Sequence, residues 1–551
     1  MSLTRRDFLT YLGVGSYSLL RNPPITSAAP AQFPTPKRKS SPPNWFQPIA
    51  PSSEDLLRVP DQYSAQVILS WDDPIGLPDH ATGPQRFGFN NDFIAYFPIN
   101  ALEGGKNSQE GLLWVNHEYT NPLFVSGYFA PASGAAPKKT VEQIRAEKRS
   151  VGGSVVHVKW DGTAWKHVPS SQYNRRITAL YPEIMLTGAA SSKIPFGIGT
   201  LGNCSGGRTP WMTALSCEEN YPDFNDIEKG FRWKDVASEA IDERQYGWVV
   251  EIDPFGELPP QKHSSLGRFK HENAAVTVSA GGKLVVYMGD DEMDQFFYKY
   301  VSHDSYNPAA SRADQRKLLS HGTLYVADLM NGRWLALDYD RNKAKFDKAG
   351  LKSQADVLIH TRQAAAALKA TPLDRCEDCE VHPLDGSIYV AMTNNAKHGN
   401  LYGQIVRFVE ANDDAASESF QYEIFLAGGP KTGLASPDNL AFRKNGDLIV
   451  VCDMSSDKLN RGAYRPFGNN GLFVVPTRGD SAGDAFQFAS GPNEAELTGP
   501  WFTEDESTLF LSVQHPGEET TDLSTPTSHW PHGGTQLPRP SIVAIRGPFG
   551  G

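Results

Sequence analysis

The chain is short of basic residues and has no long hydrophobic run beyond its N-terminal segment. Lys and Arg total 52 against 63 Asp and Glu, which gives a net charge of −11. This balance argues against a nucleic-acid-binding protein, because a phosphate backbone requires a basic surface. No later stretch reaches the roughly 18 consecutive apolar residues of a membrane-spanning helix. With 39% hydrophobic and 21% charged residues, the composition is that of a globular protein.

The N-terminus has the features of an export signal. Arg5 and Arg6 form a twin-arginine pair, a mild apolar run follows over 11–20, and 29–31 fits the small-x-small cleavage rule. We therefore expect a twin-arginine signal over 1–31 that engages the matching export machinery. The mature protein is then periplasmic or extracellular, without a membrane anchor. Because this route carries folded proteins, it suits a protein that receives its cofactor in the cytoplasm.

The rest of the chain is predicted to form one all-β domain. Residues 32–54 are rich in Pro and Ser and are predicted to be an extended linker, followed by a domain over 55–551. A turn followed by β-forming residues recurs at 280–287, 385–391, 445–451 and 504–511. Other short strands are predicted at 247–252, 323–327, 404–409, 471–475 and 541–545. Several strands per repeat of roughly 50 residues are typical of β-propeller blades.

Insertions interrupt this pattern. Helices are predicted at 141–149, 311–320 and 354–369, and 517–540 is polar and rich in Pro and Gly, as expected of a surface loop. The final strand can pair with an N-terminal strand, which closes the ring and removes exposed sheet edges.

Acidic residues gather at the ends of the predicted strands. They lie at 218–219, 272, 290–292, 377–380, 438 and 453. In a propeller such strand ends converge on the central channel, where several carboxylates repel one another unless cations neutralise them. Ca²⁺ takes six to eight oxygen ligands of this kind. The chain has neither EF-hand spacing nor an HExxH motif, so distant segments must assemble the site. Any one of these acids, taken alone, can equally be a solvated turn residue.

Three cysteines and one arginine are considered together with these acids. Cys204 lies in a Gly-flanked turn that would present its thiolate to a site. Cys376 and Cys379 are interpreted as incidental buried or paired thiols, because no second CxxC motif completes a zinc site and no thioredoxin-like context surrounds them. The planar guanidinium of Arg375 suits bidentate phosphate capture, although a salt bridge to Glu377 or Asp378 is the alternative.

A G-x-S-x-G match at 479–483 is interpreted as a hairpin turn. A nucleophile elbow needs a strand before the serine and a helix after it. The following residues, 484–491, do not form a helical pattern, so a serine hydrolase is not predicted.

Together, several segments resemble the PhoX family of bacterial alkaline phosphatases. They are 114–119, 203–211 with 215–220, 266–272, 287–291, Arg375-x-Glu377-Asp378 and 436–438. The resemblance implies a six-bladed β-propeller that is a monomeric alkaline phosphatase. It also implies a mixed site of Fe³⁺ and Ca²⁺ ions and small phosphomonoester substrates.

The same resemblance assigns individual residues. The metal ligands map to Cys204, Glu219, Glu272, Asp291, Glu377 and Asp438. Glu218 and Asp290, next to two of these, fit the spacing almost as well. Arg375 maps to the phosphate-binding residue, and Asn116 and Glu118 to the same catalytic pocket. Met212 stands where the family pattern leads us to expect Gly, and Cys376 and Cys379 flank the Arg375–Glu377 pair unexpectedly.

Two other functions fit the residues. The first is another calcium-dependent propeller hydrolase that acts on lactones or phosphodiesters. The second is a propeller without catalytic activity, in which metals only stabilise a binding domain.

Overall fold

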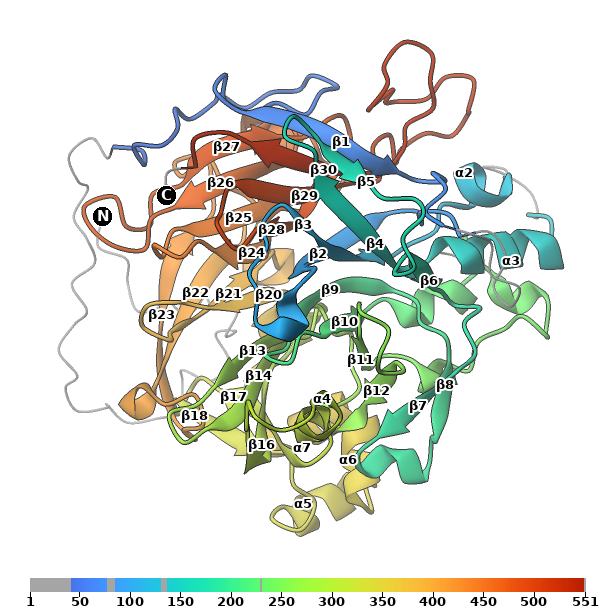
Figure 1. The fold of residues 1–551 in the computed structure, drawn as a ribbon. Coiled ribbons are helices and arrows are strands. Elements are labelled where there is room, and N and C mark those ends of the chain that lie inside the picture. The colour runs from blue at the N-terminus through green and yellow to red at the C-terminus, as the bar shows by residue number, and fades with distance from the viewer. Residues whose placement is uncertain (1–40, 77–84, 130–135, 228–229, 550–551) are drawn as a thin grey trace.

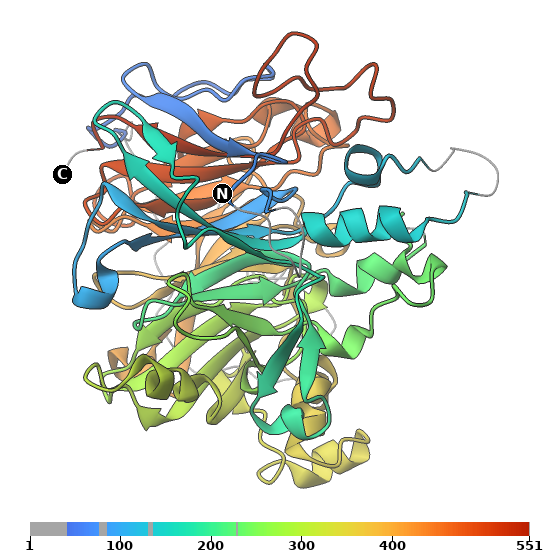
Figure 2. The same cartoon turned by 45° about the vertical axis from the view of Figure 1, so that its right-hand side comes forward.

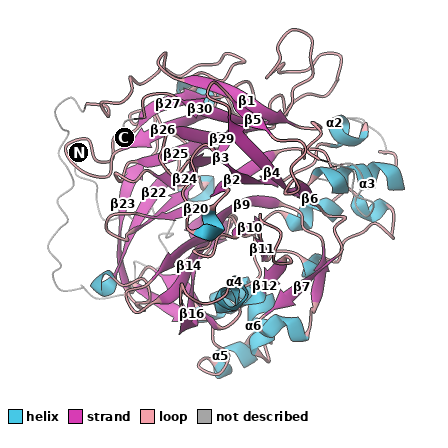
Figure 3. Cartoon of the chain, viewed as in Figure 1, coloured by secondary structure: helices cyan, strands magenta, loops and turns pink. Residues whose placement is uncertain are grey.

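A computed structural model of the chain describes residues 41–76, 85–129, 136–227 and 230–549. These residues form mainly β-sheet: six sheets of four to six strands and one of two (Figures 1 and 3). Among the described residues no helix combines the length and apolar character needed to cross a bilayer.

The first three large sheets follow one another along the chain. The first holds β2 (Asn91–Pro98), β3 (Glu110–His117), β4 (Gly152–Trp160), β5 (Trp165–His167) and β6 (Arg175–Ile177). The second holds β7 (Glu183–Thr187), β8 (Phe196–Ile198), β9 (Asn203–Arg208), β10 (Ala214–Glu218), β11 (Val249–Ile252) and β12 (Gln261–His263). The third holds β13 (Ala275–Val278), β14 (Lys283–Gly289), β16 (Phe297–Ser305), β17 (Gly322–Asp328) and β18 (Arg333–Ala336).

The other sheets complete the set. The fourth holds β20 (Cys376–Val381), β21 (Ile388–Met392), β22 (Gln404–Glu410) and β23 (Phe420–Ala427). The fifth holds β24 (Pro437–Phe442), β25 (Leu448–Cys452), β26 (Gly471–Val475) and β27 (Phe486–Ser490). The sixth holds β28 (Glu496–Phe502), β29 (Thr508–Gln514), β30 (Ser541–Arg546) and β1 (Ser64–Ser70). The small sheet pairs β15 (Met293–Gln295) with β19 (Leu373–Asp374).

In each large sheet one edge strand, which we call its first strand whatever its place along the chain, contacts the first strand of the next sheet. These contacts run from β2 to β9, β13, β20, β24 and β28, and from β28 back to β2. The N-terminal strand β1 pairs with the C-terminal strand β30, with Ser64 opposite Arg546. The predicted pairing of the two ends of the domain is therefore confirmed (Figure 1).

The core lies between neighbouring sheets, and β14 shows why the sequence favours this arrangement. Leu284, Val286 and Met288 pack on one side of the strand, whereas Val285 and Tyr287 pack on the other against the next sheet. Because both faces of the sheet are buried, the strand is a continuous apolar run and not an alternating one.

The helices lie at the periphery (Figures 2 and 3). They are α2 (Pro122–Ser126), α3 (Val141–Ser150), α4 (Arg312–Gln315), α5 (Lys343–Lys348), α6 (Gln354–Ile359) and α7 (Thr361–Leu368). The predictions at 141–149 and 311–320 are confirmed, the latter as α4 with a 3-10 turn. The single helix predicted at 354–369 was wrong, because His360, with φ −115° and ψ 49°, separates two helices.

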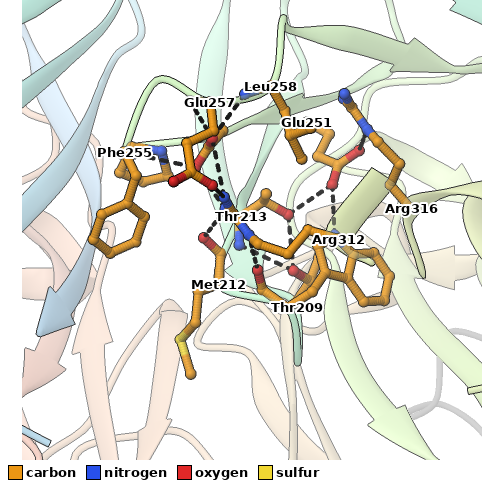
Figure 4. Close-up of polar contacts among 12 residues, drawn as sticks. Thr209, Met212, Thr213, Glu251, Phe255, Glu257, Leu258, Arg312 and Arg316 are labelled. Atoms are coloured by element: carbon orange, nitrogen blue, oxygen red, sulfur yellow. Dashed lines mark hydrogen bonds and ion pairs between the residues drawn. The ribbon is translucent and has the colours of Figure 1, made fainter. Parts of the chain in front are cut away.

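Polar contacts fix α4 to the second sheet (Figure 4). Arg312 donates to the carbonyl oxygens of Trp211 and Met212 and pairs with Asp253 at 2.6 Å. Met212 has φ +60° in the turn between β9 and β10. The residue found in place of the expected Gly thus has the left-handed backbone that Gly favours.

The predicted linker over 32–54 needs correction in its second half. Residues 1–40 lie outside the described residues, but the following segment packs against the fifth and sixth sheets. Phe46 is fully buried with Phe488, and the Ile49 amide donates to the Gln487 carbonyl at 3.0 Å. Aromatic residues among the prolines, which the composition argument ignored, explain why this part is structured.

Candidate metal centre

A repeated backbone feature directs side chains into the middle of the circuit of first strands. Five of these strands follow a residue with positive φ: Asn90, Gly202, Arg375, Ser436 and Glu494. Two residues after each of them stand Asp92, Cys204, Glu377, Asp438 and Glu496, respectively. For the residues other than Gly202, positive φ costs backbone energy and is found mostly where the surroundings enforce it, often at functional sites.

Irregular pairing accompanies this feature. The register shifts between Asn91 and Ile94, between Cys376 and Cys379, and between Pro437 and Leu440. A bulge bends a strand and changes the direction of the side chains next to it. Each shift brackets one of the acids, Asp92, Glu377 or Asp438.

The acids line a cavity of about 520 Å³. Among the residues that the structure describes, its wall contains twelve carboxylates and one arginine, Arg375. The carboxylates are Asp92, Glu118, Glu219, Glu272, Asp291, Glu377, Asp438, Asp453, Asp457, Glu496, Glu518 and Glu519. Such an excess of like charge requires protonation or bound cations.

Three groups of side chains have ligand atoms within 4.8 Å of one another. They are Asp92–Glu118–Cys204, Cys204–Glu219–Glu272 and Glu272–Glu377–Asp438. Cys204 and Glu272 are each shared by two groups, so the three form one continuous cluster. The Cys204 Sγ lies 3.1 Å from Glu272 Oε1 and 3.4 Å from Asp92 Oδ2.

The pKa values reflect burial without charge compensation. Burial raises the pKa of Asp92 to about 6, and burial together with Asp92 raises that of Glu118 to about 8. Burial and neighbouring carboxylates raise the pKa of Glu272 well above its ordinary value, and the same causes act on the Cys204 thiol. Since each of these groups is fully or almost fully buried, the cluster is electrostatically costly unless positive charge is bound.

Arg375 places a guanidinium in the cavity wall. Its Nη2 lies 2.7 Å from Asp291 Oδ2 and 2.8 Å from Glu377 Oε1. Burial opposes the ionisation of Asp291, but Arg375 outweighs it and the pKa of Asp291 is lowered. The Arg375 guanidinium is thus held in place at the wall, and 24% of the Arg375 side chain is exposed.

The structure brings eight of the nine predicted site residues to this cavity. They are Cys204, Glu219, Glu272, Asp291, Glu377, Asp438, Arg375 and Glu118. Asn116 lies behind the wall: its Nδ2 donates to the carbonyl oxygens of Cys204, at 2.6 Å, and Ser205, at 2.9 Å. Its contacts position the thiol-bearing strand β9 and do not reach the cavity.

The neighbouring acids that fitted the spacing almost as well have other partners. Glu218 pairs with the buried Lys262 at 2.7 Å, and Asp290 pairs with Arg362. Each of these two acids thus has its own cation away from the cavity. This supports the choice of Glu219 and Asp291.

The cysteines flanking Arg375 do not form a disulfide. All five cysteines are free and buried, and the Cys379 thiol donates to Asn273 Oδ1 at 3.2 Å. Cys376 and Cys379 pack in the core between the third and fourth sheets. The interpretation as incidental buried thiols is confirmed. The G-x-S-x-G segment likewise lies in the turn between β26 and β27, as expected of a hairpin.

Sequence reasoning missed several residues of the cavity wall, four of them with ionisable side chains next to strand ends. Asp92 is the second residue of β2 and Glu496 the first of β28, whereas Asp453 and His515 follow β25 and β29. Asp453 was noted among the acids but not assigned to the site. The signal for Asp92 and Glu496 is their position two residues after a left-handed residue, which only the backbone reveals.

Comparison with known proteins identifies relatives of the chain. Residues 44–517 match the family described as Alkaline phosphatase PhoX. The solved structure of Pseudomonas fluorescens PhoX in complex with vanadate, a transition state analogue, is 32% identical, with a TM-score of 0.77, and the match covers 92% of this chain and 98% of that chain. A gluconolactonase from Xanthomonas campestris is 10% identical over 87% and 97% of the chains, with a TM-score of 0.33. None of the curated proteins compared with the chain matches it.

Proposed function

Since the chain belongs to the PhoX family of alkaline phosphatases, and is a phosphoric monoester hydrolase, we propose that it hydrolyses small phosphomonoesters at the acidic cavity with bound Fe³⁺ and Ca²⁺. The observation that carries this assignment is the continuous cluster of carboxylates and one thiol beside a single arginine. The closed circuit of contacts between first strands supports a six-bladed β-propeller with the cavity on its axis.

The donor atoms fit these ions. Glu272 Oε2 and Asp291 Oδ1 are buried without a hydrogen-bond partner, as expected of atoms that bind a cation. Carboxylate oxygens suit Ca²⁺, and the thiolate of Cys204 suits iron. The ligands are the six predicted residues, Cys204, Glu219, Glu272, Asp291, Glu377 and Asp438, joined by Asp92, Glu118 and Glu496.

The bound ions and the residues of the chain have separate roles in the reaction. When bound, the ions polarise the phosphoryl oxygens and neutralise the charge that develops on them. Arg375 binds the phosphate through its guanidinium, which Asp291 and Glu377 hold in a fixed orientation. Asn116 positions the strand that carries Cys204. No side chain is required to form a covalent bond with the substrate.

The test is phosphate release from p-nitrophenyl phosphate by protein loaded with iron and calcium. We expect Arg375→Ala to lower kcat/KM by about 100-fold, as for other preorganised groups that stabilise developing charge. Arg375→Lys keeps the charge but not the planar fork and should have an intermediate effect. Arg333→Ala, at an exposed arginine of β18, serves as the matched control. Absence of turnover, or equal rates for wild type and Arg375→Ala, would contradict the proposal.

Elemental analysis separates the proposal from a purely structural metal site. Iron together with calcium supports the mixed centre, whereas calcium without iron contradicts it. The protein should be purified after export by its native route, because the N-terminal segment is proposed to direct twin-arginine export of the folded, metal-loaded protein. Arg5→Lys combined with Arg6→Lys should then retain the protein in the cytoplasm.

A further inference from the structure

A second, smaller cavity adjoins the acidic one. Its volume is about 240 Å³, and Tyr119, His515 and Glu518 line both cavities. Glu118 and Tyr119 are consecutive just after β3: Glu118 lines the acidic cavity alone, whereas Tyr119 lines both cavities. A molecule bound by its phosphate at the acidic cavity can therefore extend into the smaller one.

Aromatic rings form the walls of this side cavity. Tyr119 and Phe231 stack with centroids 5.8 Å apart, and Phe89 and Phe124 stack at 6.1 Å. All four rings line the cavity. A cavity of about 150 Å³ lined by apolar side chains is enough to bind benzene, so this volume accommodates one aromatic ring with substituents.

Two buried polar atoms in the wall lack a partner. Asn90 Oδ1 and Thr120 Oγ1 make no hydrogen bond, although Asn90 is 4% and Thr120 is 3% exposed. Buried polar atoms without a hydrogen bond are rare in folded proteins because each of them lowers the stability of the fold. Both residues line the side cavity, beside its aromatic rings.

We propose that the side cavity is the leaving-group subsite and that it favours esters of neutral aromatic alcohols over those of aliphatic alcohols. The proposal rests on the phosphatase function given above. Two acidic side chains of the wall, Asp223 and Glu518, outnumber the one basic side chain among its described residues, His515, so an anionic leaving group is disfavoured. The ring of an aryl phosphate lies between the aromatic side chains while its phosphate binds beside Arg375.

The test compares kcat/KM for phenyl phosphate and glycerol 2-phosphate in wild type and Phe124→Ala. Phe124 lies half-buried on the short helix α2, so its truncation leaves the sheets intact. We expect the phenyl-to-glycerol ratio to fall about 5- to 10-fold. Because the two esters are compared as a ratio across variants, their different intrinsic reactivities cancel. Phe129→Ala is the matched control, since Phe129 is 54% exposed outside the cavity.

A binding measurement tests the subsite without the hydrolysis step. Inhibition constants for phenylphosphonate and methylphosphonate, which are not hydrolysed, should show that Phe124→Ala lowers the preference for the phenyl compound to a similar extent. Phe231→Leu provides a second variant that keeps the core filled while removing the flat ring. If wild type hydrolyses neither ester, the phosphatase proposal and this one both fail. If it hydrolyses both and neither variant changes either preference, the subsite alone is refuted.

Discussion

Removal of bound metal should make the stability of this protein fall as the pH rises. In the absence of a cation, burial and Asp92 raise the pKa of Glu118 from an ordinary 4.5 to about 8. Burial raises the pKa of Asp92 from 3.8 to about 6. The folded state therefore retains protons that the unfolded chain releases. Stability decreases with rising pH wherever the folded state holds more protons than the unfolded chain.

The pH range and the size of the effect follow from these values. Below about pH 3 both carboxyl groups are protonated in both states and contribute almost no penalty. As the pH rises to about 8 the unfolded chain ionises while folded Glu118 does not, and the penalty grows to about 5 kcal/mol for this residue alone. With about 2.1 cal/mol/K of unfolding entropy per residue, this lowers the Tm of a chain of this size by about 4 °C.

The assay is thermal unfolding, followed by tryptophan fluorescence, of chelator-treated and metal-loaded protein between pH 5 and pH 9. Glu118→Gln keeps the shape of the side chain and should flatten the slope of the chelator-treated protein. Glu142→Gln, at an exposed position of α3, should leave that slope unchanged. A metal-free Tm that is constant or rises between pH 5 and pH 8, or an unchanged slope in Glu118→Gln, would refute this account of the cluster.

Three further outcomes are expected. With iron bound as proposed, Cys204→Ser should reduce the iron content and abolish visible absorption, measured by elemental analysis and spectroscopy, since a thiolate–Fe³⁺ bond absorbs visible light; unchanged iron content and absorption would contradict the proposed iron site. Thiol titration should find five reactive groups in denatured protein and almost none in native metal-free protein, because all five cysteines are free and buried; a smaller number after denaturation would indicate a disulfide. Glu251→Ala should lower the free energy of unfolding by about 3–5 kcal/mol in denaturant titration, because it leaves buried Arg316 and His263 without their carboxylate; a loss below 1 kcal/mol would contradict this.

The strands were predictable because their signal is local. The apolar runs at 283–287, 388–391, 448–451 and 508–511 after turn residues became β14, β21, β25 and β29. Each run depends only on strand propensity and on a turn that neighbouring residues specify. The break at His360 was not predicted because no Pro or Gly marks it in the sequence, and the segment around Phe46 was not predicted to pack because its contacts are with distant residues such as Phe488.

The residues of the site were likewise only partly predictable from the sequence. The sequence by itself determined that carboxylates stand at strand ends and that Cys204 and Arg375 lie among them, since residue type and nearby turns are local properties. Only the tertiary structure decided that Asp92 and Glu496, which lie 404 positions apart in the chain, share one cavity wall, and that Glu218, Asp290 and Asn116 face elsewhere. The physical reason is that left-handed residues and register shifts set the direction of each side chain, and these depend on how neighbouring strands pair.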